Sequence, residues 1–438
     1  MVVRRGSLAL PEAALRDNLT VVRQLLEHGA KPNKTEFVLT SIGWASHNGN
    51  IEMFNLLLQY GARINKYIKK YPTTVLIEAA ERDHADMAKF LLDKNIPLDF
   101  EDRDGMTALS YAAGNYNFEL VKLLTEKGAD VNHKNRRGQS IMELAVDDAG
   151  RMPADSNIIY YLVNKGANIS PEVFKGVCYT SQTHLAEYFI DHGFPITQDL
   201  IVPAIQSGNL NFVRSLESDF HLSSNYFDPG SNVNSLFAAT YGYLSPGAKK
   251  RKLNVDLLSY ILTKTPDSIF IKAGPRAFAN LFQSDYTDSS IAACAELFIN
   301  KGISVNALSD SFSGASFLMN AVSIRSQQTI KLLTEHGARV NYKDKLGRSA
   351  ISMASEYGNT NSIEYLIAHG ADINLKDANE RTPIMNAALA SSFENIRLLA
   401  ERGADLNLKD RSGKTVLDYA QDESIKAYLV SKGAKKGD

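Results

Sequence analysis

One short stretch contains the residue types that a phosphate-binding loop uses. The segment RSGKT at 411–415 resembles the end of such a loop. The full pattern requires a glycine five positions before Gly413, and Leu408 stands there. Gly413 and Thr415 instead fit a turn followed by a helix cap. We therefore predict that this segment binds no nucleotide.

A second stretch, DRDG at 102–105, has the carboxylates and the glycine of a calcium loop. With Gly105 in the sixth position, the first position would be Phe100 and the twelfth Tyr111. Neither residue offers a carboxylate to a calcium ion. We interpret the aspartates as residues that brace a turn, and we predict no cofactor for this chain.

The cysteines and histidines are also sparse for catalytic or metal chemistry. Cys178 and Cys294 are far apart, match no metal spacing and occupy positions that call for buried side chains. His84 lies beside Asp83 and Asp86, but such close neighbours on one turn converge poorly on a metal. Four histidines stand directly before a glycine, where the last turn of a helix favours a cation: His28, His192, His336 and His369. We predict no metal site and no enzymatic activity.

The composition limits the class of protein. The 438 residues exceed one ordinary hydrophobic core, so several domains or a repeat array are expected. The formal charge of -1 provides no general attraction to nucleic acid. The apolar runs are too short to span a bilayer, and the first residues lack the pattern of a signal peptide. The two cysteines provide no disulfide framework, so we expect a cytoplasmic protein without membrane insertion.

One sequence motif, Gly-Ala-x-x-Asn, recurs along the chain at a nearly constant interval, and we call it the repeat phrase. Its glycines are Gly29, Gly61, Gly128, Gly337, Gly370 and Gly403. Several of these glycines are 32 or 33 residues apart, and a weakened copy at Asn95 fills the longest early gap. A fixed period of this length indicates a stack of similar units, each too small to bury its own apolar face.

The stretch DGMTALSYAAGNYNFELVKLLTEKGADVN, 104–132, shows how each unit is organised. Apolar residues at helical spacing predict two short helices: Leu109, Ala112, Ala113, Leu120, Val121, Leu123 and Leu124. Thr107 is placed to cap the first helix, and Gly128 is placed to end the second. Between the glycine that ends one unit and the turn glycine of the next, the sequence predicts an extended, hairpin-like loop that joins the two units. We call this loop a finger.

These units resemble ankyrin repeats. The family pattern is approximately D-x-x-G-x-T-P-L-H-x-A-A-x-x-G, followed by an apolar helix and G-A-D-x-N. The sequence has the Thr-Pro pair at Thr382 and Pro383, while Ser110, Ser352 and Met385 replace the usual histidine. The resemblance implies an all-α solenoid of about thirteen helix–turn–helix units. We expect three parts: regular repeats over 5–166, degenerate repeats over 167–304, and regular repeats with a shortened last unit over 305–438.

The resemblance also implies a non-enzymatic adaptor, inhibitor or effector that binds another protein through its concave groove and its finger loops. We expect the aromatic, basic and apolar residues at these positions in units two to five to contact a partner with an acidic or mixed surface. They are Phe37, Leu39, Trp44, His47, Lys70, Tyr71, Arg103, Met106, Tyr111, Arg136 and Arg137. An alternative is that Trp44 and Tyr111 only pack against neighbouring units.

Other interpretations remain open. The irregular segment 223–252, which ends in the basic run KKRK, is a rival binding region. An unrecognised enzymatic site within 168–302 and a purely structural tether are further alternatives. We expect a monomer, with a dimer through the first repeat as the alternative, because apolar residues such as Val2 and Leu8 lie near its start.

Overall fold

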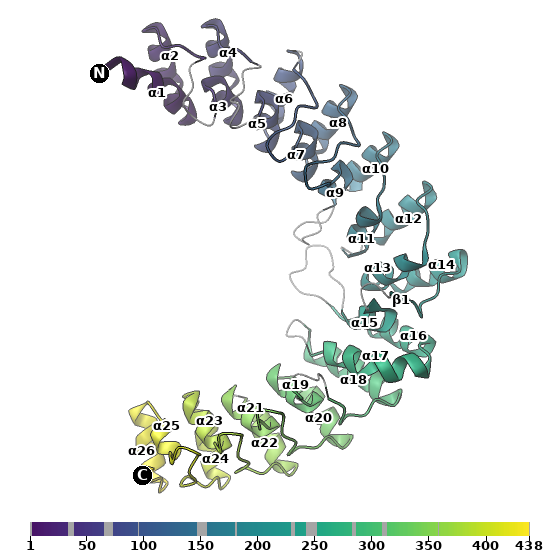
Figure 1. The fold of residues 1–438 in the computed structure, drawn as a ribbon, viewed down its shortest axis with the longest axis vertical. Coiled ribbons are helices and arrows are strands. Elements are labelled where there is room, and N and C mark those ends of the chain that lie inside the picture. Colours follow the sequence, from purple (N-terminus) through teal and green to yellow (C-terminus); the bar gives the residue numbers. More distant parts are fainter. Residues whose placement is uncertain are drawn as a thin grey trace. The chain divides into compact units, whose positions relative to one another are not determined.

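The computed structural model describes residues 2–33, 39–64, 73–94, 96–146, 156–179, 182–228, 233–241, 252–282, 286–308, 313–357 and 359–437. The chain divides into two units by its internal contacts, unit 1 over Met1–Pro195 and unit 2 over Ile196–Asp438. In each unit, short helices follow one another in antiparallel pairs (Figure 1). The fold is therefore the all-α helix–turn–helix solenoid that the sequence predicts, and thirteen such pairs lie along the described residues.

The described residues of unit 1 form six helix pairs, and the first helices of neighbouring pairs pack against one another. The helices are α1 (Val2–Leu15), α2 (Leu19–Glu27), α3 (Ser41–His47), α4 (Ile51–Gln59), α5 (Val75–Glu81), α6 (Ala85–Leu92), α7 (Ala108–Gly114), α8 (Phe118–Glu126), α9 (Ile141–Ala145), α10 (Ser156–Asn164), α11 (Pro171–Tyr179) and α12 (Thr183–Asp191).

The described residues of unit 2 form a short 3-10 helix, seven helix pairs and one small antiparallel hairpin, in which Phe227 pairs with Asn234. Its elements are η1 (Gln198–Leu200), α13 (Ile201–Gln206), α14 (Leu210–Phe220), β1 (Phe227–Asp228), β2 (Val233–Asn234), α15 (Ser235–Thr240), α16 (Val255–Lys264), α17 (Asp267–Asn280), α18 (Asp288–Asn300), α19 (Phe317–Ser323), α20 (Gln327–Glu335), α21 (Ala350–Glu356), α22 (Thr360–Ala368), α23 (Pro383–Leu389), α24 (Phe393–Glu401), α25 (Val416–Tyr419) and α26 (Glu423–Ser431).

The pair α7 and α8 shows why these short segments are helical. The Thr107 hydroxyl accepts a hydrogen bond from the Ser110 backbone N–H, and the Ser110 hydroxyl accepts one from the Thr107 N–H. The Asn117 side chain accepts a hydrogen bond from the Leu120 N–H at the start of α8, and Gly128 follows the end of α8 at a φ of 96°. The predicted apolar positions are buried except Leu123, which is half-buried. The sequence prediction for this unit is confirmed.

Among the described residues, five asparagines near the ends of units join their unit to the next. The Asn132 side chain donates to the Gly166 carbonyl at 3.1 Å and accepts from the Asn168 N–H at 2.8 Å. Asn33, Asn306, Asn341 and Asn407 make the same two bonds to the following repeat. We call this arrangement the asparagine clamp. It explains why the phrase ends in an amide, which both donates and accepts.

Replacing Asn132 tests the clamp directly. We expect Asn132→Ala to lower the free energy of unfolding by about 1–2 kcal/mol, because two hydrogen bonds are lost. Asn132→Asp keeps the hydrogen-bond acceptor, so its free energy of unfolding should fall by about half as much. An aspartate already fills this role at Asp99, which accepts from the Asp130 N–H at 2.9 Å. Urea unfolding followed by circular dichroism measures both variants. Equal stability of Asn132→Ala and the unchanged chain would contradict the prediction.

Between α17 and α19 a cluster of phenylalanines forms the core. Phe278 is fully buried, with its ring centroid 4.4 Å from that of Phe317 and 5.3 Å from that of Phe298. Phe270 and Phe282 extend the cluster. The repeat phrase is weakest in this part of the sequence, and large aromatic side chains provide the burial there.

Candidate functional site

Three first helices of unit 1 present one side chain each from equivalent repeat positions. Trp44 on α3, Glu78 on α5 and Tyr111 on α7 are 34 and 33 residues apart. These helices pack side by side. Trp44 and Tyr111 are half-buried, whereas Glu78 is 6% exposed. The stack therefore places a carboxylate between two aromatic residues that the sequence identifies as candidate contacts.

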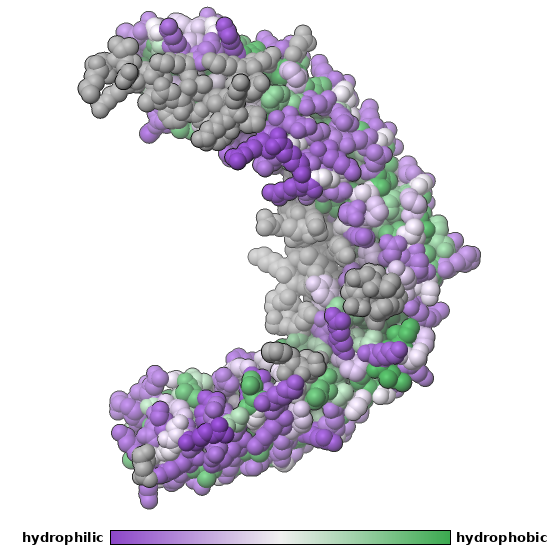
Figure 2. Space-filling view, in the orientation of Figure 1, coloured by the Kyte–Doolittle hydropathy of each residue, from purple (hydrophilic) through white to green (hydrophobic). Residues whose placement is uncertain are grey.

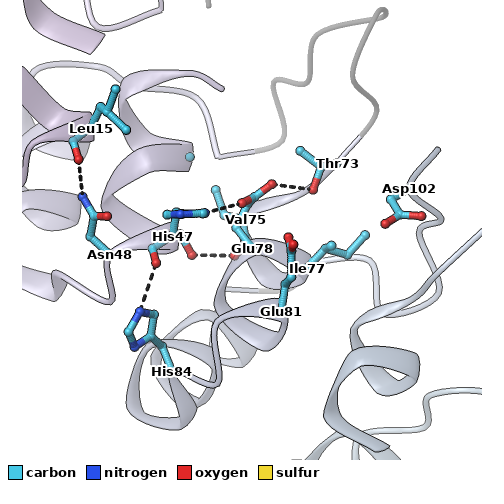
Figure 3. Close-up of polar contacts among 12 residues, drawn as sticks. Leu15, His47, Asn48, Thr73, Val75, Ile77, Glu78, Glu81, His84 and Asp102 are labelled. Carbon is cyan, nitrogen blue, oxygen red and sulfur yellow. Dashed lines mark hydrogen bonds and ion pairs between the residues drawn. The ribbon is translucent and has the colours of Figure 1, made fainter. Parts of the chain in front are cut away.

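A polar cluster joins α3 to α5 at this position (Figure 3). His47 Nδ1 lies 2.9 Å from Glu78 Oε2, and the Thr73 hydroxyl donates to Glu78 Oε1 at 3.0 Å. The His47 carbonyl accepts from His84 Nε2 at 3.0 Å, and the Trp44 and His47 rings meet edge to face at 5.0 Å. His47 thus links two repeats. Because of these contacts, only 18% of its side chain is exposed.

Burial raises the pKa of Glu78 above its ordinary value of 4.5, although hydrogen bonds from His47 and Thr73 oppose this effect. A carboxyl with a raised pKa binds its proton more tightly in the folded state than in the unfolded state. The free energy of unfolding should therefore fall as the pH rises from 4.5 through the raised value.

The variant Glu78→Gln should lack this pH dependence, because a glutamine side chain does not titrate. We expect it to be more stable than the unchanged chain at neutral pH, with the difference shrinking below the ordinary pKa of glutamate, where both carry no charge at this position. Urea unfolding at neutral and acidic pH measures the difference. Glu119→Gln, an exposed change on α8, is the control. A difference independent of pH would contradict the expectation.

The finger before α7 is held by Asp102. Its Oδ1 accepts from the backbone N–H groups of Asp104 and Met106 at 2.8 and 2.9 Å, and its Oδ2 accepts from the Tyr111 hydroxyl at 2.7 Å. Burial and this hydrogen bond raise the pKa of Tyr111. Asp102 therefore braces the turn, as the sequence indicates, and fixes the Tyr111 ring beside it.

Adjacent fingers lie against each other and expose arginines. The Arg136 N–H donates to the Asp104 carbonyl at 3.0 Å, and Asn135 Nδ2 lies 3.5 Å from the sulfur of the half-buried Met106. Arg103, Arg136 and Arg137 are exposed, and none forms an ion pair within the described ranges. In Figure 2 strongly hydrophilic residues gather near the fingers that precede α7 and α9. Three cations from two neighbouring repeats thus share one edge.

The remaining predicted contacts differ in their surroundings. Leu39 is 6% exposed, and its side chain lies close to Gly43 in the first turn of α3, so it has little surface to offer. Phe37, Lys70 and Tyr71 lie outside the described residues. The sequence reasoning missed Glu78, which the repeat spacing could have identified, because it occupies the position of Trp44 and Tyr111 one unit along.

The two cysteines are buried, and the four histidines before closing glycines are hydrogen-bonded. Cys178 and Cys294 are fully buried, and burial raises the pKa of both thiols, that of Cys294 to about 12. The four histidines before closing glycines use Nδ1 to contact a carbonyl in the last helical turn, as His28 does with Gln24 at 2.7 Å. Since a carbonyl only accepts, each ring nitrogen is the donor.

Among the described residues, no group of three or more histidine, cysteine, aspartate or glutamate side chains is arranged to hold a metal ion. No helix within the described ranges is long and apolar enough to cross a membrane. The Trp44 indole N–H is buried and has no hydrogen-bond partner among the described residues.

The sequence profile described as "Ankyrin repeats (3 copies)" matches residues 10–102, 42–135, 76–173 and 288–377, and together these ranges cover more than half of the chain. The chain belongs to the ankyrin-repeat family. A second profile, "Ankyrin repeats (many copies)", matches residues 377–420. Ankyrin repeats are a protein-interaction module, so this ankyrin-repeat chain provides a surface for binding another protein.

Three similar proteins illustrate how widely the repeats occur. Putative ankyrin repeat protein FPV115 of Fowlpox virus is 24% identical over 208 residues, which are 46% of this chain and 37% of that protein. Ankyrin repeat and KH domain-containing protein mask-1 of Caenorhabditis elegans is 35% identical over 130 residues, 28% of this chain and 5% of that protein. Potassium channel AKT2/3 of Arabidopsis thaliana is 31% identical over 128 residues, 29% of this chain and 16% of that protein. The chain thus spans well under half the length of each relative.

Proposed function

We propose that this ankyrin-repeat chain is a non-enzymatic adaptor, inhibitor or effector that binds a partner protein on the fingers and first helices of repeats two to five. One observation carries the proposal: Arg103, Arg136 and Arg137 project from adjacent fingers without ion-pair partners in the described ranges. The carboxylate of Asp102, by contrast, is engaged by its own finger and Tyr111. Unpaired guanidinium groups beside half-buried aromatic and thioether groups are typical of interface centres.

The partner surface should be acidic or mixed in charge. The arginines favour carboxylates, which a planar guanidinium binds through two parallel hydrogen bonds. Exposed Glu101 and Asp104 on the same finger favour some basic groups in the partner. Met106 and Tyr111 add apolar surface next to the charges, and Trp44 adds apolar surface two repeats earlier.

Further parts of the proposal concern the whole molecule. We place it in the cytoplasm as a monomer, with a dimer through the first repeat as the alternative. We also retain three functional parts, 5–166, 167–304 and 305–438, of which the first carries the partner site and the second contains the irregular insertions. The neutral overall charge favours a protein partner over nucleic acid.

Removing the arginines tests the partner site. Affinity capture from the lysate of the native cell, followed by mass spectrometry, would compare the full chain with the triple variant Arg103→Ala, Arg136→Ala, Arg137→Ala. We expect a specific partner to be retained by the full chain and to lose at least about tenfold in affinity with the variant, since each desolvated arginine contact contributes about 1 kcal/mol or more.

The matched control removes three positive charges from the second helices of the same unit. Lys89→Ala, Lys122→Ala and Lys165→Ala change exposed residues at or just after α6, α8 and α10. Equal loss of the partner with both triple variants would indicate general attraction by charge. Full retention by the arginine variant would move the site away from these fingers.

A further inference from the structure

Unit 2 contains an open surface hollow of about 570 Å³ on the side of its second helices, which we call the cavity. The cavity is bounded by α14, by α16 and by the loop 221–226 that follows α14. It lies in the part of the sequence where the repeat phrase is degenerate. Arg214, Glu217, Asn225, Tyr260 and Lys264 line it, and their polar groups determine what it can bind.

The one carboxylate among these residues is already satisfied. Glu217 Oε2 accepts from the Tyr260 hydroxyl, and Glu217 Oε1 accepts from the Ser224 N–H at 3.0 Å. Burial opposes ionisation of Glu217, but the hydrogen bonds from Ser224 and Tyr260 and the nearby Lys264 outweigh it and lower its pKa. Glu217 therefore stays ionised at neutral pH and ties the loop to both helices.

The two cations of the cavity are less engaged. The Arg214 guanidinium carbon lies 5.0 Å from the centre of the Tyr260 ring, and Lys264 Nζ lies 5.4 Å from it. Both residues are exposed, and neither forms an ion pair with any described residue. Two positive charges thus face one carboxylate whose oxygens already accept hydrogen bonds. The site has an excess positive charge next to an aromatic ring.

The loop that closes the cavity is fixed in place. Gln198 Nε2 donates to the Ser223 carbonyl at 2.8 Å, and Gln198 Oε1 accepts from the Ser223 N–H at 2.9 Å. Asn225 Oδ1 is buried and has no hydrogen-bond partner among the described residues. A buried acceptor without a donor is costly, and a donor from a bound group or an ordered water would relieve that cost. The shape of the cavity is therefore fixed by the protein itself. An anion would pair with its excess positive charge, and an N–H donor would satisfy Asn225 Oδ1.

We propose that this cavity binds an acidic peptide segment, with an oxyanion of a side chain between Arg214 and Lys264 and a peptide N–H directed toward Asn225. A peptide provides both an anionic side chain and a backbone N–H, whereas a free anion provides only the negative charge. Tyr260 offers an apolar face between the cations. The anion of the peptide is a side-chain carboxylate. A phosphoryl group on a serine is the other source of the same negative charge. This site is independent of the finger surface in unit 1.

The test uses the full chain and isothermal titration calorimetry at low ionic strength, where exposed charges are least screened. The probe is a capped hexapeptide of alternating glutamate and glycine, and the same peptide with glutamine is the uncharged comparison. We expect binding of the glutamate peptide only, weakened about tenfold by Arg214→Ala with Lys264→Ala, since each exposed charge pair contributes up to about 1 kcal/mol.

The matched control removes two lysines with the same local geometry elsewhere in unit 2. Lys331 Nζ lies 6.0 Å from the ring centre of Tyr365, and Lys432 Nζ lies 5.6 Å from that of Tyr428. Lys331→Ala with Lys432→Ala should leave the affinity unchanged. Glu217→Gln should strengthen binding about threefold, because it removes the competing charge while a side-chain oxygen still accepts from Ser224.

Each result decides the proposal. Equal weakening by the two double variants, or no detectable binding of the glutamate peptide, overturns it. Weaker binding by Glu217→Gln overturns it as well, since a folded loop with less negative charge should favour the anion. A phosphoserine peptide that binds much more tightly than the glutamate peptide, with the same dependence on Arg214 and Lys264, would support the site and assign it to the phosphoryl source. Loss of the partner by the unit 1 arginine variant does not bear on any of these results.

Discussion

Gly347→Ala is expected to be among the most destabilising small substitutions in this chain. Gly347 has a φ of 72°, and an added Cβ would lie 2.3 Å from the backbone nitrogen of Ala378 on the next finger. The left-handed backbone alone costs about 1–2 kcal/mol with a side chain. Overpacking adds about 1–3 kcal/mol, because backbone of the next finger must move. We expect a total loss of about 2–5 kcal/mol.

Gly370→Ala separates these two contributions. Gly370 has a similar φ of 87°, but an added Cβ would meet no atom within 4 Å. We expect its loss to be about 1–2 kcal/mol, which is the backbone cost alone. Urea unfolding of both variants, together with hydrogen exchange of the fingers before α21 and α23, measures the difference. Equal losses would show that the fingers move apart freely, and would contradict the close contact.

The second large effect is expected from Phe278→Ala. The Phe278 ring is fully buried and contacts the rings of Phe282, Phe298 and Phe317. Removing it leaves a cavity among side chains from α17, α18 and α19, and such changes cost about 3–5 kcal/mol. Because a repeat array is stabilised through neighbour contacts, the loss should first weaken the repeats on either side.

Hydrogen exchange followed by mass spectrometry locates that loss. Peptides from α17 to α19 should lose protection before those from α21 to α24. Phe282→Ala is the matched control, since Phe282 is in the same cluster but only half-buried. Its cost should be clearly smaller. A uniform loss of protection along the chain would instead show that unit 2 unfolds as one cooperative body.

The repeat period predicted the architecture because each unit repeats the same local signals. Thr107 as a cap, Gly128 as a helix end and Asp102 as a turn brace could all be identified from their types and positions. The role of Asn132 was harder to foresee, since its partners Gly166 and Asn168 belong to the next repeat. Where the phrase degenerates, the sequence alone could not predict that phenylalanines from three helices would meet.

The candidate sites show the same limit. The exposure of Arg103, Arg136 and Arg137 follows from their places beside turn glycines, which a single repeat reveals. The contact between His47 and Glu78, and that between Glu217 and Tyr260, join residues 31 and 43 positions apart. Such pairs depend on how side chains of neighbouring repeats are oriented, and a pattern along one unit does not contain that information.

The asparagine clamp also bears on how such a chain can evolve. Both of its bonds go to backbone atoms of the following repeat, so the joint does not depend on which side chains that repeat carries. A gene segment that encodes one regular unit can therefore be duplicated, deleted or exchanged while the joint is preserved. The phenylalanine-based junctions near α17 lack this tolerance, because each ring fits particular neighbours. Lineages should accordingly differ in their number of regular repeats more readily than in the irregular middle.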